Sequence, residues 1–271
     1  ELINGKISFT KSIAEKISNE LGFPAVEFLK IQSNYNLARY ETQDSDEQEA
    51  YEYIKKYDIV IDIKTICKRL NIEFKTPFVK VIESLQNIFT VTPNQLATQY
   101  TGMFKKSDKT GLDERMILTW VLLAKYISHS LAVQGVYQKE NIKELVFTLR
   151  KIFHENKNVV SQVTETLSQY GIRFCIVDKV EKASIDGFSC IDNEIPTIVV
   201  TKRFDRIDNF AFSVMHELGH IYYNHCNELK FNISIDSFEE ELSKEEERAN
   251  QFALYALIDR KLWENKPCSK I

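Results

Sequence analysis

The run His216-Glu217-Leu218-Gly219-His220 constrains the fold of this chain more than any other feature of the sequence. Two histidines four residues apart lie on one face of a helix, about one turn apart, so their ring nitrogens can converge on one metal ion. Apolar residues recur at helical spacing through the same stretch, at Phe210, Val214, Leu218 and Ile221. The sequence therefore predicts a partly buried helix here, with Asp205 or Asp208 as the cap at its start.

Glu217 follows the first histidine directly, and its carboxylate can face an open coordination position and take a proton from a water molecule. Gly219 is costly inside a helix, so we expect another segment or a substrate to approach the backbone closely there. The alternative is a surface helix that carries two unrelated histidines. The apolar stripe beside them disfavours it, because unpaired imidazole rings next to a buried face are costly.

A catalytic zinc ion needs a third protein ligand and an open position. His225 is the nearest candidate by sequence. The long zincin pattern H-E-x-x-H-x-x-G-x-x-H would place a glycine and a histidine where this chain has Tyr223 and Cys226, so that subclass is excluded. An oxyanion donor is also expected; Tyr222, Tyr223 and His225 are candidates, although each can equally be a packing or helix-end residue.

Glu246 is the stronger candidate for the third ligand, because it lies on the next predicted helix. It shares a helical face with small or apolar groups that can pack against the motif helix, namely Ala249, Asn250, Ala253 and Leu257. Ser243 and Glu246 also form an S-x-x-E capping box, which alone explains a glutamate at this position. Spacing therefore leaves both interpretations of Glu246 open.

The rest of the chain is mainly helical in pattern. Two helices are expected between residues 9 and 40, broken at 21–24, and the polar stretch 42–49 is expected to be a linker or capping loop. Further helices are expected between 50 and 171, followed by a strand at 172–177 and a hairpin whose strands cover 187–191 and 196–201. We expect an α+β fold: a mainly helical chain with a small β-sheet packed beside the active-site helix.

Composition narrows the class of protein. Hydrophobic residues make up 44% and charged residues 27% of the chain, and the apolar runs are too short to cross a bilayer, so no membrane segment is expected. The five cysteines are scattered without a C-x-x-C pair, which argues against a disulfide framework and favours the reducing cytoplasm. With a net charge of -4, any contact with nucleic acid must be local.

The run 205–220, followed by Glu246-x-x-Ala249-Asn250-x-Phe252-Ala253, resembles the ImmA/IrrE family of metallo-endopeptidases. The hairpin with Asp186-Gly187-Phe188 and the run 195–200 also fits that family, although Arg248 stands where an acidic residue is common. The resemblance implies a gluzincin-like domain with zinc ligands His216, His220 and Glu246, and with Glu217 as the general base. It also implies a protein substrate, a repressor or antitoxin, whose cleavage releases a stress, phage or mobile-element response.

The N-terminal stretch 1–37 is similar to the second half of an XRE-type helix-turn-helix domain of the kind found in HigA-like antitoxins. The similarity implies a possible DNA contact, but the recognition helix would precede residue 1. We therefore expect three parts: a partial XRE-like helix-turn-helix remnant at 1–45, a helical middle segment at 46–140 and an ImmA/IrrE-like metallopeptidase domain at 141–271.

Two functions follow from these expectations. The first is a zinc-dependent endopeptidase that binds its substrate in extended form, along an edge strand of the 187–201 hairpin. The alternative is a helix-turn-helix DNA-binding regulator or antitoxin-like module whose metal domain senses a signal or binds a partner without cleaving it. Glu217 disfavours the alternative, because a structural zinc is normally bound by four protein ligands and has no use for an adjacent carboxylate.

Overall fold

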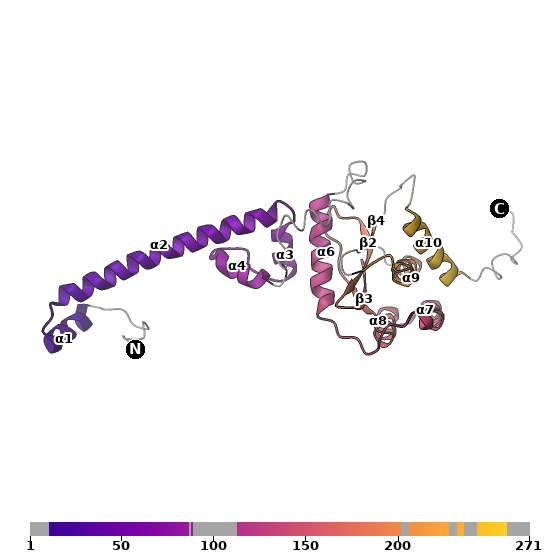
Figure 1. Cartoon of the computed structure of the whole chain (residues 1–271), viewed down its shortest axis with the longest axis horizontal. Helices are drawn as coiled ribbons and strands as arrows, with labels where there is room; N and C mark the ends of the chain where they lie inside the picture. Colours follow the sequence, from indigo (N-terminus) through magenta and orange to yellow (C-terminus); the bar gives the residue numbers. More distant parts are fainter. Residues whose placement is uncertain are drawn as a thin grey trace, which may run out of the picture. The chain divides into compact units, whose positions relative to one another are not determined.

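The computed structural model describes residues 11–86, 88, 113–201, 206–227, 232–235 and 243–258. The chain divides into two compact units, one made of Glu1–Lys56 with Asn71–Gln86 and the other of Tyr57–Leu70 with Asn87–Ile271. Figure 1 shows the elements of both units in chain order.

The first unit is helical. It contains α1 (Lys11–Leu21), α4 (Phe78–Leu85) and most of α2 (Ala25–Asp58), and the predicted break between the first two helices is confirmed at Gly22, which has φ 72°. The amide of Phe78 at the start of α4 donates to Oε1 of Glu47 on α2 at 2.6 Å. The polar stretch 42–49, which we expected to be a linker or capping loop, lies inside α2, so that expectation is wrong.

The second unit is built around a sheet of four strands among the described residues, β1 (Arg173–Ile176), β2 (Ile185–Asp192), β3 (Ile195–Val200) and β4 (Asn232–Ile235). The strand order is β1-β3-β2-β4, with β1 parallel to β3 and the other neighbours antiparallel. The predicted strand and hairpin are thus confirmed, but β4 was not predicted. Both hairpin strands lie inside the described sheet, so the expectation that one of them is an edge is wrong.

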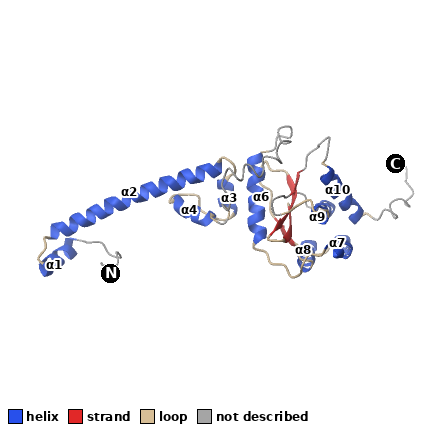
Figure 2. Ribbon diagram, in the orientation of Figure 1, coloured by secondary structure: helices blue, strands red, loops and turns tan. Residues whose placement is uncertain are grey.

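Helices cover both faces of this sheet, as Figure 2 shows. The helices that contact the strands are α6 (Glu114–His129), α8 (Val159–Gln169) and α9 (Ile207–Tyr222). The other helices of this unit pack on these helices: α3 (Ile63–Arg69) on α6, α7 (Ile142–Glu155) on α8 and α9, and α10 (Lys244–Leu257) on α9, with a short 3-10 helix, η2 (Lys139–Asn141), before α7. Trp120 of α6 packs edge-on against Phe188 of β2, with ring centroids 6.4 Å apart. The neighbouring Gly187 faces α9 instead, because successive residues of a strand point to opposite faces.

The core that positions α9 is apolar. Phe174 of β1 and Ile198 of β3 are paired in register and, with Val214 and Leu218 of α9, belong to one buried cluster that also includes residues of α7 and α8. Burial of this stripe fixes which face of α9 turns toward the sheet. The mainly helical α+β architecture with a small mixed sheet beside the motif helix is confirmed.

The start of α9 differs from the sequence prediction. The N-cap of α9 is Arg206, and Asp208 lies in the first turn, where its carboxylate accepts a hydrogen bond from Nε of Arg206 at 3.1 Å. Asp208 is therefore not the cap, and Asp205 lies outside the described residues.

No helix in the described parts of the chain is both long and apolar enough to cross a membrane. Residues 1–10 of the XRE-like stretch also lie outside the described residues, and that similarity stays a prediction.

Candidate active site

His216, His220 and Glu246 come together between α9 and α10. One candidate ligand atom from each residue lies within 4.8 Å of the others. The Nε2 atoms of the two histidines are 3.0 Å apart, and the Glu246 carboxylate oxygens lie 3.2 Å from Nε2 of His216 and 3.3 Å from Nε2 of His220. Both histidines are buried, and the side chain of Glu246 keeps 26% of its exposure.

These distances fit a bound metal ion. A tetrahedral ion with bonds of about 2.0–2.2 Å to nitrogen and oxygen separates its ligand atoms by roughly 3.3–3.6 Å. The three separations in the structure, 3.0, 3.2 and 3.3 Å, are at or slightly below this range. Two histidines and one glutamate are also a donor set used by catalytic zinc, which keeps a further position open.

The far side of each imidazole ring is held by a second polar residue. Nδ1–H of His216 donates to Oδ1 of Asn250 at 2.9 Å, and Nδ1 of His220 lies 3.1 Å from Nδ1 of His225. A proton held on Nδ1 leaves the lone pair of Nε2 directed at the common centre. Asn250 and His225 therefore orient the two candidate ligands.

The charges of the cluster support the same arrangement. Burial lowers the pKa of His216, but its contact with Glu246 and the charge of Glu217 outweigh burial and raise the pKa above its ordinary value. Burial raises the pKa of Glu246, but its contacts with His216 and His220 outweigh burial and lower the pKa to about 2. The carboxylate is thus ionised and favours positive charge among these atoms, which a metal cation can supply.

Glu217 is fully buried on α9, next to His216. Its carboxylate lies against the backbone of Gly187 on β2, where a Cβ would come within 2.9 Å of Cγ and Cδ of Glu217 and overlap Oε1. The glycine therefore makes room for this carboxylate. The sequence included Gly187 in the hairpin but gave no sign of this contact.

The packing of α10 on α9 brings Glu246 to the histidines. Gly219 allows it, because a Cβ there would lie 3.1 Å from Cβ of Phe252 and 3.2 Å from Cα of Ala249. The close approach expected at Gly219 is thus made by α10. Ser243 caps α10 by accepting from the amide of Glu246 at 3.2 Å, while the Glu246 side chain contacts the histidines. The cap and the ligand position are therefore compatible.

Comparison with protein families shows which known domain this region resembles. Residues 168–266 match the family model Peptidase_M78, the IrrE N-terminal-like domain. This part of the chain is similar to the ImmA/IrrE family. Peptidase_M78 is a family of metallopeptidases, and the match covers the sheet, α9 and α10. Comparison with curated proteins and with solved structures gave no further match.

Within the matched region, the structure brings together every residue that the sequence proposed as a ligand except His225. Nδ1 of His225 faces His220, so this residue lies behind a candidate ligand. Tyr223 stacks on His225 with ring centroids 5.6 Å apart, and Tyr222 packs against Phe252 at 5.5 Å. These contacts of Tyr222, Tyr223 and His225 are packing or orienting contacts, and none identifies an oxyanion donor. Arg248, the departure from the family pattern, is exposed.

Proposed function

We propose that the chain is a zinc-dependent endopeptidase that hydrolyses a peptide bond in a regulatory protein, a repressor or an antitoxin. The observation that supports this most strongly is the convergence of His216, His220 and Glu246 within 4.8 Å, with the buried carboxylate of Glu217 next to one of them. A structural metal site would not need that carboxylate. The match to a metallopeptidase family supports the same class of reaction.

The proposed mechanism assigns a separate task to each residue. Nε2 of His216, Nε2 of His220 and the Glu246 carboxylate would hold a zinc ion, which when bound would polarise the scissile carbonyl and make water more acidic. Glu217 takes a proton from the attacking water and passes it to the leaving amine. Asn250 and His225 hold the imidazole rings in the orientation that binding requires.

The substrate is proposed to bind in extended form. In the described sheet β4 lies outside β2 and has no second strand partner, so its backbone is where an extended segment can add by main-chain hydrogen bonds. β1 is the other outer strand of the described sheet, but β4 is the one that pairs with β2 at Gly187, so we propose the pairing on β4 instead of the hairpin strands. Such pairing holds the backbone of a substrate and leaves the choice of side chains to neighbouring cavities.

The test uses the Glu217→Gln variant as a trap. This variant keeps every proposed metal ligand and lacks only the proposed base, so it should bind the target protein without cleaving it. A protein captured from extracts of the source cells by zinc-loaded Glu217→Gln would be purified and incubated with the zinc-loaded wild-type chain. The proposal expects cleavage at a defined bond by the wild type and none by the variant. Equal cleavage by both would rule out the assigned base.

A further inference from the structure

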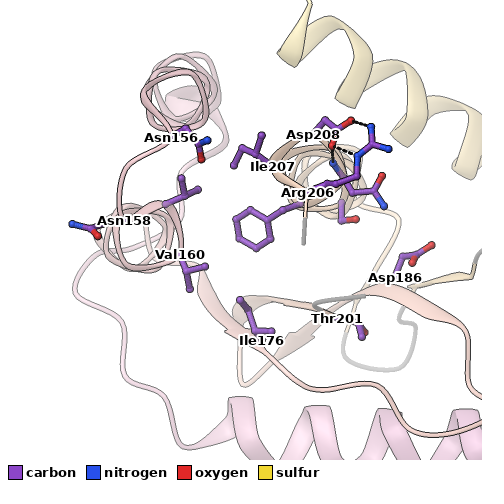
Figure 3. A pocket seen from close by; sticks show the side chains of 13 residues that line it. Asn156, Asn158, Val160, Ile176, Asp186, Thr201, Arg206, Ile207 and Asp208 are labelled. Carbon is purple, nitrogen blue, oxygen red and sulfur yellow. Dashed lines mark hydrogen bonds and ion pairs between the residues drawn. The ribbon is translucent and has the colours of Figure 1, made fainter. Parts of the chain in front are cut away.

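A cavity of about 650 Å³ lies at the N-terminal end of α9, the helix that carries the proposed catalytic residue (Figure 3). Its walls come from the turn between α7 and α8, the start of α8, the ends of β1 and β3, the start of β2 and the first two turns of α9. Figure 3 shows Val160, Ile176 and Ile207 approaching it from α8, the sheet and α9. A volume of this size is typical of a small-ligand site.

The cavity continues the active-site face of α9. Ser213 lines it and lies four residues, about one helical turn, before Glu217 on the same face. Asp186 also lines it and directly precedes Gly187, whose backbone touches the Glu217 carboxylate. Two elements that contact or carry Glu217, β2 and α9, therefore also contribute to the wall of the cavity.

One part of the cavity wall is apolar, while polar side chains line the rest. Phe210 is partly buried, and its ring is held edge-on by Phe153 at 6.1 Å and by Phe174 at 6.2 Å between centroids. Ile176 is also partly buried, while Val160 keeps 43% of its exposure. Covering apolar surface that is already fixed in place is favourable and orders little of the protein.

Two opposite charges at the rim are already paired. Arg206 donates from Nε to Asp208 at 3.1 Å and makes a second contact with the same carboxylate. The pair keeps both residues charged, since it raises the pKa of Arg206 and lowers the pKa of Asp208. Asp186 is the third charged residue that lines the cavity. A charged substrate side chain on the α9 side of the rim would have to compete with the pair of Arg206 and Asp208, whereas an apolar side chain would not.

We infer that this cavity is a specificity subsite that receives an apolar side chain, aliphatic or aromatic, from the substrate residue beside the scissile bond. The inference rests on the proposed function, because it needs a peptide held at the metal site. It adds a substrate class: cleavage next to a large apolar residue, with the side chain covering Val160, Ile176 and Phe210.

The experiment uses short peptide hydroxamates, whose hydroxamate group binds a zinc ion and whose neighbouring side chain probes the adjoining cavity. Four compounds differ only at that residue, which is Gly, Leu, Phe or Asp. Their dissociation constants are measured by calorimetry on the zinc-loaded full chain. The Leu and Phe compounds should bind at least about tenfold more tightly than the Gly compound, and the Asp compound should bind no more tightly than the Gly compound.

Val160→Asp places a charge on the apolar part of the cavity wall. Val160 is exposed and is the second residue of α8, where an aspartate is compatible with the helix start, so this variant should fold. It should reduce the advantage of the Leu compound over the Gly compound to below about threefold. Val136→Asp is the matched control, because Val136 is 80% exposed and does not line the cavity. This control should retain the full advantage.

The outcomes separate the inference from the function on which it rests. Equal affinity of the Leu and Gly compounds would leave the metal centre standing and overturn the subsite. Tightest binding of the Asp compound, or an unchanged Leu advantage in Val160→Asp, would likewise overturn it. Binding of no hydroxamate at all would overturn the proposed metal centre, and the subsite with it.

Discussion

Gly187 on β2 lies directly against the carboxylate of Glu217 on α9, so closely that a Cβ on residue 187 would overlap Oε1 of Glu217. The sheet thus forms one wall of the space in which the proposed base lies. Strand and helix are separated in the sequence, and only their packing creates this wall. The position of the Glu217 carboxylate therefore depends on Gly187, a residue without a side chain.

Replacing Gly187 by alanine should slow peptide cleavage by about 10²-fold. The added Cβ would overlap the Glu217 side chain and push its carboxylate out of position. Zinc affinity should stay within about threefold of the wild type, because Gly187 is not among the candidate ligands. Steady-state cleavage rates and zinc competition titrations measure the two effects separately.

A double variant provides the control for this prediction. Glu217→Asp shortens the side chain and removes the closest contact, the one with Oε1, so Gly187→Ala should cause a smaller additional loss in the Glu217→Asp background. Losses that multiply in the double variant would show that Gly187 acts through some other part of the structure.

Glu217→Gln should reduce the cleavage rate by about 10²–10⁴-fold, because the amide cannot take a proton from the attacking water. Gln keeps the size of the side chain and its fit against Gly187, so the fold should be unchanged. Single-turnover cleavage and the zinc content of the purified variant are the measurements. A variant that keeps its zinc and still cleaves at the wild-type rate would remove Glu217 from the mechanism.

Glu246→Ala should weaken zinc binding by more than the 10–100-fold loss typical of a residue that only orients a ligand, about 10²-fold or more. The cap of α10 should remain, because Ser243 accepts from the backbone amide of residue 246. Glu247→Ala is the matched control, since Glu247 is exposed one position away on the same helix. Similar zinc dissociation constants for the two variants would exclude Glu246 as a ligand.

His225→Ala and Asn250→Ala should each weaken zinc binding by about 10–100-fold, because each removes the contact that orients a candidate ligand. His225→Asn, which keeps a polar partner for His220, should recover part of the loss. His154→Ala is the control, since His154 is an exposed histidine far from α10 in sequence. Unchanged zinc affinity in both alanine variants would show that the two contacts do not orient the rings.

The local parts of this fold could be predicted because their signals are local. The apolar stripe around His216 predicted α9, the run 172–177 predicted β1, and turn residues predicted the β2–β3 hairpin. Ser243 was predicted as a helix cap and is one. Each of these depends on residues a few positions apart, where periodicity and turn chemistry act.

The errors involve competing local bonds or weak signals. Asp208 pairs with Arg206 instead of capping α9. The stretch 42–49 contains no glycine or proline, so polarity alone does not end α2. β4 was missed because it is only four residues long, although Asn232-Ile233-Ser234-Ile235 alternates polar and apolar residues.

The contacts around the candidate site could not be read from the sequence, because they join segments far apart in the chain. Spacing placed Asn250 on the face of Glu246 but gave it no role, and packing of α10 on α9 places its amide oxygen at His216. His225 was weighed as a ligand, and only the turn after α9 shows it behind His220. Nothing local links Gly187 to Glu217.

The most direct test of the central claim is a crystal structure of the zinc-loaded chain with anomalous data collected at the zinc edge. The account predicts one anomalous peak bound by Nε2 of His216, Nε2 of His220 and the carboxylate of Glu246, with its remaining position open to solvent beside Glu217. A peak elsewhere, or a fourth protein ligand that closes the coordination sphere, would contradict it.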